Sequence, residues 1–321
     1  MVRRGQTSLD TGMNTPYFTD SLAWQTSRRG FLKAAGILAA GAATCGLDAA
    51  ASSPKTLFGS NVYGWTQYYQ RDKKPFNLDE VISALADCGY DYLENFLDAN
   101  NPEATAQFAE KLRAKGMRPA SLYTGAALHE ATRAREVVAR LLRCAVVCQK
   151  AGFESLSCNP DPIGREKTDE ELANTVSALK DLGQGLKELG LKLGIHHHLP
   201  EMQNKAREFH YVLRHTPPDL VGLCYDVHWV WKGGLQPMEV LPEYGRRITS
   251  WHLRQSRQGG WHEVLDTGDI DYEAVAKYAR EHQLARRFTI ELALESKTAI
   301  TRSAVENHRL SLNWAKKVFG S

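Results

Sequence analysis

The feature that most constrains this 321-residue chain is a unit that repeats from Thr56 onward. In each unit a short apolar run, typical of a buried strand, precedes an amphipathic helical pattern and a turn that contains glycine. The repeat length of about thirty residues suits a strand–helix–strand unit with parallel strands. The candidate strands are 56–62, 90–95, 118–123, 154–158, 191–197, 221–226, 248–253 and 287–292.

Specific signals mark the ends of the intervening helices. Asn101 before Pro102 predicts an N-cap followed by proline at the first helical position. Thr168 and Glu171 have the spacing of a capping box. The helical stretches are followed by glycines that favour a left-handed C-terminal cap, namely Gly89, Gly116, Gly152 and Gly190.

Eight strands that alternate with helices over residues 52–321 predict a single α/β domain, a (β/α)8 barrel of the TIM type. A doubly wound parallel sheet is the alternative. That fold favours a glycine-rich phosphate loop after the first strand, and residues 59–65 contain no such loop.

Composition excludes some partners. Hydrophobic residues make up 43% of the chain and charged residues 24%, which is typical of a globular protein. The net charge of +3 is spread out beyond the N-terminus, so we expect no nucleic-acid partner. Of the six cysteines, Cys144 and Cys148 share a helix face; buried free thiols are the interpretation we favour, although an exported protein can form disulfides.

Residues 1–51 predict a twin-arginine signal peptide. Residues 27–33, Ser-Arg-Arg-Gly-Phe-Leu-Lys, match the export motif, and the apolar run over 34–43 is too short to span a bilayer. A cleavage site at 49–51 would start the mature protein near Ser52. We therefore expect a periplasmic or otherwise exported protein that uses the twin-arginine machinery. Thr44 before Cys45 departs from a lipobox, which argues against lipid anchoring.

Side chains that can bind metal gather at the predicted strand ends, where TIM barrels carry their active sites. They are Glu94, His196, His197, His198, Asp226, His228, His252 and Glu291. Alternation along a strand puts His196 and His198 on one face and His197 on the other. Two imidazoles and two carboxylates that converge indicate a divalent transition-metal site. Any one of these residues could instead be a hydrogen-bonded core residue, although a buried Glu291 needs a partner.

Three segments resemble the xylose-isomerase-like family of sugar isomerases and epimerases. The stretch 223–237 contains Asp226-Val227-His228-Trp229, Gly233-Gly234 and Pro237, and resembles that family's D-V-Y-W-V-x-x-G-G-x-x-P signature. Residues 244–253 and 265–272 resemble two further family segments. The resemblance implies one divalent ion held by His196, Asp226, His252 and Glu291, with manganese, zinc or cobalt first and magnesium as a further candidate.

The resemblance also implies residues that bind a carbohydrate substrate. His198 and Trp229 fall on substrate-binding positions of the family. Arg254, which we also assign to substrate binding, stands where the family has a lysine after the strand-7 histidine. Aromatic residues that could line a sugar pocket, or serve only in packing, are Tyr63, Trp65, Tyr123, Trp229 and Trp231; of these we also assign Tyr63 and Trp65 to substrate binding.

The predicted function is a metal-dependent sugar isomerase or epimerase that acts on a keto- or aldo-sugar through an enediolate. Glu291 is the first choice for the catalytic base and Glu94 the second. One alternative is a lyase that performs β-elimination on a 3-keto-sugar or keto-inositol. Another is a non-catalytic, exported sugar-binding barrel. A DNA-repair endonuclease of the same superfamily is disfavoured, because the second and third strands end without the histidines it needs. Homo-oligomerisation stays open.

Two departures from the family bear on the reaction. Many of the family's epimerases have glutamate where this chain has His196, and the run 196–198 resembles the corresponding segment of inosose dehydratases. A metal-bound imidazole is a poor base, so we expect elimination or isomerisation ahead of two-base epimerisation. The second departure is Arg254-Gln255 in place of the family's lysine-aspartate pair.

Overall fold

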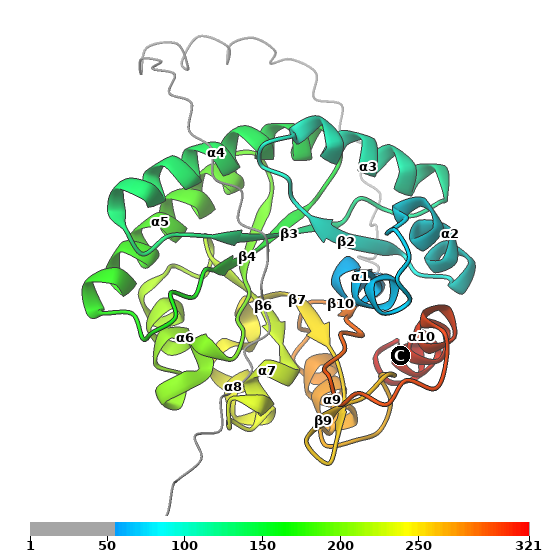
Figure 1. Cartoon of the computed structure of the whole chain (residues 1–321). Helices are drawn as coiled ribbons and strands as arrows, with labels where there is room; N and C mark the ends of the chain where they lie inside the picture. Colours follow the sequence, from blue (N-terminus) through cyan, green and yellow to red (C-terminus); the bar gives the residue numbers. More distant parts are fainter. Residues whose placement is uncertain (1–54, 321) are drawn as a thin grey trace, which may run out of the picture. The chain divides into compact units, whose positions relative to one another are not determined.

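A computed structural model describes residues 55–320, which contain a closed barrel of eight parallel strands (Figure 1). Around the barrel the strands follow the order β1 to β7, with β10 closing the circle between β7 and β1. The eight strands are β1 (Leu57–Asn61), β2 (Tyr92–Phe96), β3 (Ser121–Ala126), β4 (Ser155–Pro160), β5 (Lys192–Ile195), β6 (Gly222–Asp226), β7 (Ile248–Leu253) and β10 (Arg287–Ile290). The predicted (β/α)8 barrel is confirmed.

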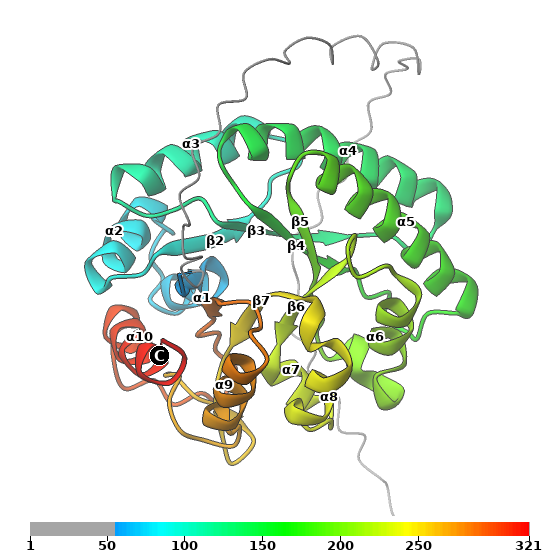
Figure 2. The ribbon, with the colours of Figure 1, turned by 180° about the vertical axis from the view of Figure 1, so that it is seen from behind.

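Helices cover the outside of the barrel, as the view from behind also shows (Figure 2). They are α1 (Val62–Arg71), α2 (Leu78–Cys88), α3 (Pro102–Ala114), α4 (Ala131–Lys150), α5 (Asp169–Glu188), α6 (Gln203–His215), α7 (Val227–Lys232), α8 (Pro237–Tyr244), α9 (Tyr272–Glu281) and α10 (Ala304–Phe319). Short 3-10 helices lie at η1 (Pro200–Met202) and η2 (Gly245–Arg247). A small hairpin of β8 (Ser256–Arg257) and β9 (Gly260–Trp261) follows β7.

The predicted helix caps are confirmed. The Asn101 side chain accepts from the backbone of Ala104, and Thr168 and Glu171 form a reciprocal capping box. The four predicted cap glycines all have positive φ, from 71° to 87°. These ends fix where each helix stops and where the next strand enters the barrel.

The strand predictions differ from the structure mainly at β3. This strand begins at Ser121 and not at 118, because the chain at 118–120 runs as a loop whose Arg118 N–H bonds to Asp91 and whose Pro119 has no N–H to donate. β5 is also shorter than predicted, so His196 and His197 follow the strand end directly.

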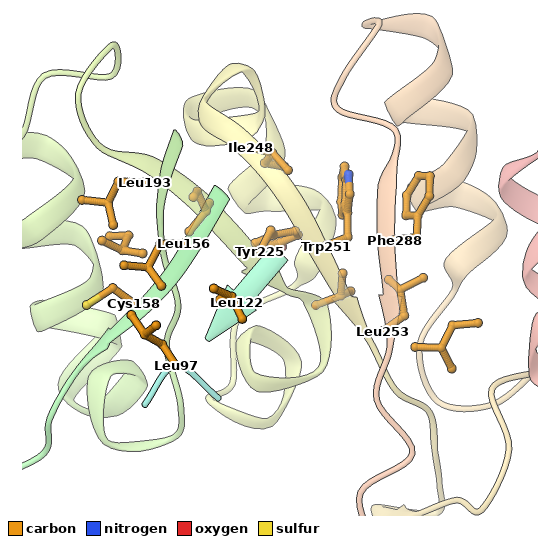
Figure 3. Packing of buried hydrophobic residues seen from close by; sticks show 14 of the residues in the cluster. Leu97, Leu122, Leu156, Cys158, Leu193, Tyr225, Ile248, Trp251, Leu253 and Phe288 are labelled. Atoms are coloured by element: carbon orange, nitrogen blue, oxygen red, sulfur yellow. The ribbon is translucent and has the colours of Figure 1, made fainter. Parts of the chain in front are cut away.

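The core lies between the strands and the surrounding helices. Figure 3 shows buried side chains on several of these strands, including Leu156, Tyr225, Trp251 and Phe288. Trp251 stacks on Phe288 with ring centroids 5.9 Å apart. Cysteines 88, 144, 148, 158 and 224 are free thiols, four of them buried, which agrees with the favoured interpretation.

The predicted twin-arginine signal and the residue Cys45 lie outside the described residues. Over the described residues 55–320, none of the helices has the length and apolar character needed to cross a membrane.

Candidate metal and substrate site

Three predicted ligands meet at the C-terminal end of neighbouring strands. His196 follows β5, Asp226 ends β6 and His252 lies in β7. One ligand atom from each lies within 4.8 Å of the other two, and all three side chains are buried. Nε2 of His196 is 3.5 Å from Oδ2 of Asp226 and has no hydrogen-bond partner among the residues that the structure describes. Asp226 also caps α7, because its Oδ1 accepts from the backbone N–H of Trp229.

The fourth predicted ligand, Glu291, follows β10 and contacts His252, but it is not one of the three residues whose ligand atoms meet. Its Oε2 lies 3.0 Å from Nδ1 of His252, and its Oε1 lies 3.5 Å from Nη1 of Arg254. Burial raises the pKa of Glu291, but the hydrogen bond with His252 and the charge of Arg254 outweigh it and hold that pKa well below its ordinary value. The chain just beyond Glu291 packs closely on α1: a β-carbon on Gly64 would lie 2.6 Å from the carbonyl oxygen of Leu292.

Glu94 lies deeper, on β2, and is fully buried. Its Oε1 is 2.8 Å from Nε2 of His252 and accepts from Asn61, while its Oε2 accepts from Ser121 and Ser157. His252 therefore lies between two carboxylates, one at each ring nitrogen. Burial lowers the pKa of His252, but Cys224 and then Glu94 and Glu291 outweigh burial and hold that pKa well above its ordinary value. The carboxylates thus favour a positive charge at this point.

The three consecutive histidines alternate as predicted. The ring of His198 is 4.7 Å from that of His196, on the same side of the chain, and 5.7 Å from Trp229. His197 points the other way: it packs on Phe209 of α6 and its Nε2 bonds to the backbone carbonyl of Asp226. Burial lowers the pKa of His198 to about 4, so its imidazole is neutral near pH 7.

Arg254 and two tryptophans form one wall of the site. The guanidinium carbon lies 5.0 Å from the ring centre of Trp229 and 3.8 Å from that of Trp261. The two indoles are nearly perpendicular, with an angle of 80° between them. Arg254 therefore occupies the corner that they make.

The two predicted aromatic residues at the start of α1 have different surroundings. Tyr63 is half-buried, and burial and then the negative charge of Glu291 raise its pKa. Trp65 is buried, stacks on His308 of α10 at 4.3 Å and donates to Ser60. The contacts of Trp65 are those of a packing residue. Tyr123 lies beside the site, with its hydroxyl 3.5 Å from Nδ1 of His196.

The chain matches a known protein family over most of its length. Residues 82–318 match the xylose isomerase-like TIM barrel family. The chain belongs to this family. The family resemblance seen at residues 223–272 is therefore confirmed.

Individual relatives and solved structures give further context. An inosose dehydratase of Geobacillus kaustophilus is 29% identical over 209 residues, which are 60% of this chain and 65% of that protein's length. A sugar phosphate isomerase/epimerase of Parabacteroides distasonis superposes with a TM-score of 0.66 at 18% identity, covering 84% of this chain and 96% of its own. A structure of the IOLI protein with a bound zinc atom superposes with a TM-score of 0.65 at 16% identity, covering 82% and 98%. The two solved structures support the fold alone.

The donor set fits a divalent transition-metal ion. Two imidazole nitrogens and a carboxylate meet, and a second carboxylate touches one of the imidazoles. The buried, unpartnered Nε2 of His196 is what a metal ligand requires. Oε1 of Glu94 lies 2.8 Å from Nε2 of His252 without forming a hydrogen bond, so its negative charge is next to a ring whose Nδ1 could bind an ion.

Several residues of the site carried no signal in the sequence. Asn61, Ser121 and Ser157 bond to Glu94, but small polar residues on strands are common and none of them stands out. Trp261 lies in the hairpin after β7, and only the tertiary fold brings it to Arg254. Asn159, with its Oδ1 3.4 Å from Nδ1 of His196, lies just past the predicted end of β4.

Proposed function

We propose that this chain is a divalent-metal-dependent lyase that removes the proton next to the carbonyl group of a keto-sugar or keto-polyol and expels a β-hydroxyl group. The observation that carries the proposal is the contrast between two carboxylates. Glu291 contacts His252 of the metal-ligand cluster, and its side chain is 12% exposed to solvent. The side chain of Glu94 is completely buried and accepts hydrogen bonds from several side chains. Glu291 is therefore the carboxylate that a substrate proton can reach.

The residues of the site then take the following roles. His196, Asp226, His252 and Glu291 would hold the ion, which when bound supplies a Lewis acid for the carbonyl oxygen. Glu291 takes the proton from the carbon next to that carbonyl. It can return this proton to the departing hydroxyl, so that water leaves and a single group serves both steps. Glu94 is a positioning residue, which orients His252 through Nε2.

The single base favours elimination over epimerisation. Inversion of a stereocentre often needs an acid/base group on each face, and the strand-5 position that would supply the second one is His196. A coordinated imidazole has no lone pair left on its ligating nitrogen. The inosose dehydratases among the sequence relatives agree with elimination. Sugar isomerisation shares the first step and is the second candidate, supported by the signature at residues 226–237.

The test is solvent exchange with the manganese-loaded protein. A panel of inososes, ketohexoses and 3-keto-glycosides is incubated in D2O, and deuterium at the carbon next to the carbonyl and the loss of water are followed by NMR and mass spectrometry. Glu291→Gln should lower exchange by about 10²- to 10⁴-fold at saturating metal, as expected for loss of a general base. Glu94→Gln is the matched comparison: it should weaken metal binding yet keep much of the exchange once metal saturates. Full exchange in Glu291→Gln would contradict the assigned base.

A further inference from the structure

Arg254 is a buried cation with donors to spare. Its side chain is 2% exposed, and the nearest carboxylate oxygen, Oε1 of Glu291, is 3.5 Å from Nη1. Nε and Nη2 have no hydrogen-bond partner within residues 55–320. Buried charged donors are costly unless they are paired, so these two N–H groups call for an acceptor.

The two free nitrogens lie on the same edge of the guanidinium group. Nε and Nη2 present parallel N–H bonds, and this fork matches the two oxygens of a carboxylate. The other edge carries Nη1, which faces Glu291. The indoles of Trp229 and Trp261 lie against the group, so an acceptor has to approach in the guanidinium plane.

Hydrogen bonds hold the backbone of Arg254, and the two indoles pack against its guanidinium group. Its N–H donates to the hydroxyl of Tyr272, and that hydroxyl donates to the Arg254 carbonyl at 2.6 Å. Trp261 is held in turn, because its backbone N–H donates to Glu295. Both sides of the wall are therefore held in place before a ligand binds, and a ligand has to displace neighbouring groups to reach the buried Nε and Nη2.

We propose that Arg254 binds a carboxylate group of the substrate through Nε and Nη2, so that the substrate class is a sugar acid and not a neutral sugar. The inference rests on the proposed function for the identity of the site, but carboxylate binding needs no turnover. A carboxylate satisfies both donors and the charge of Arg254, whereas a pair of sugar hydroxyls satisfies only the donors.

The experiment compares acids with their neutral amides. D-Glucuronate and D-galacturonate are each titrated against the matching uronamide by calorimetry, with manganese-loaded protein. At least one acid should bind the wild type about tenfold or more tightly than its amide, the size expected for a charge-assisted pair of hydrogen bonds. Arg254→Gln should abolish this preference, and Arg254→Lys, which keeps the charge but lacks the fork, should lose most of it. Arg257→Gln is the matched control, an exposed arginine on the same hairpin, and should keep the preference.

Two results would overturn the inference. One is a wild type in which neither acid binds more tightly than its amide. The other is a preference that persists in Arg254→Gln, since the ion or another group would then hold the carboxylate. Circular dichroism and metal content establish that each variant is folded and loaded, and Arg254→Lys serves if Arg254→Gln does not fold. If the protein prefers acids but catalyses no solvent exchange on any substrate, the proposed function is contradicted and this inference is not. If the protein catalyses exchange on neutral keto-sugars but does not prefer acids over amides, this inference is contradicted and the proposed function is not.

Discussion

At the scale of single residues, Glu201 is a buried carboxylate with one oxygen unused. Oε2 accepts from the backbone N–H of His198 at 2.7 Å, while Oε1 has no partner in the described part of the chain. Burial and then the negative charge of Glu208 raise the pKa of Glu201 to about 7. The protonation of Glu201 is thus coupled to the segment that carries His198 into the site.

This raised pKa predicts a pH-dependent stability. The folded state binds the proton more tightly than the unfolded chain, so the stability that Glu201 contributes is fully present below about pH 4.5 and is lost as the pH rises through about 7. Glu201→Gln keeps an acceptor for His198 and cannot ionise. Its free energy of unfolding, relative to wild type, should therefore rise between pH 5 and pH 8 by up to ~3 kcal/mol. Urea unfolding at both pH values measures this. Glu110→Gln, at an exposed position of α3, is the control, and an equal difference at both pH values for Glu201→Gln would contradict the prediction.

At the scale of elements, one amide holds the loop that follows β7. Nε2 of Gln255 donates to the carbonyls of Asp266 and Ile270, and Oε1 accepts from the N–H groups of Ser256 and Ile270. An amide both donates and accepts, whereas a carboxylate only accepts. The family's aspartate at this position has no N–H group and could not donate to the two carbonyls. The loop that contains Trp261 therefore depends on glutamine.

Gln255→Glu should therefore open this loop. Two backbone carbonyls would lose their donor and face a negative charge, at a cost of about 2–4 kcal/mol in the free energy of unfolding or of local opening. Amide hydrogen exchange over residues 256–270 and urea unfolding measure the two quantities. Gln107→Glu, on the exposed face of α3, makes the same chemical change and should stay within about 0.5 kcal/mol of wild type. Unchanged exchange in the loop of Gln255→Glu would show that the amide is not what holds it.

The helices, the strands and the polar residues at the strand ends could be predicted from the sequence, because each is indicated by residues close to it in the chain. Caps such as Thr168 depend on neighbouring residues, and ligands such as Asp226 end an apolar strand. Side-chain direction on α1 could not be predicted. Tyr63 and Trp65 are two residues apart, which is about 200° around a helix, so they face opposite sides. Once α1 begins at Val62, directly after β1, Trp65 faces α10 and Tyr63 faces away from it. Trp261 depends on a loop conformation that tertiary hydrogen bonds decide.

At the scale of the whole molecule, the barrel order explains why the four proposed ligands come from one side of the barrel. β5, β6, β7 and β10 are consecutive around the closed sheet, although a hairpin and α9 separate the last two along the chain. An ion bound to all four would link half of the barrel circumference. Metal binding should therefore stabilise the fold as a unit, by an amount set by the free metal concentration relative to Kd.

The last prediction uses Asp226, which has two separable roles. Its Oδ1 caps α7, and burial raises the pKa of its carboxyl, so the charge is costly without an ion. Asp226→Asn keeps the cap acceptor and removes the charge. In EDTA the variant should be as stable as wild type or more so. With manganese at about 100 times the wild-type Kd, wild type should gain about 2.7 kcal/mol and the variant far less, so that the order of stability reverses. Urea unfolding with and without manganese, together with metal analysis, tests this, and Asp219→Asn, at an exposed position, should respond as wild type does. An equal gain in Asp226→Asn would remove Asp226 from the ligand set.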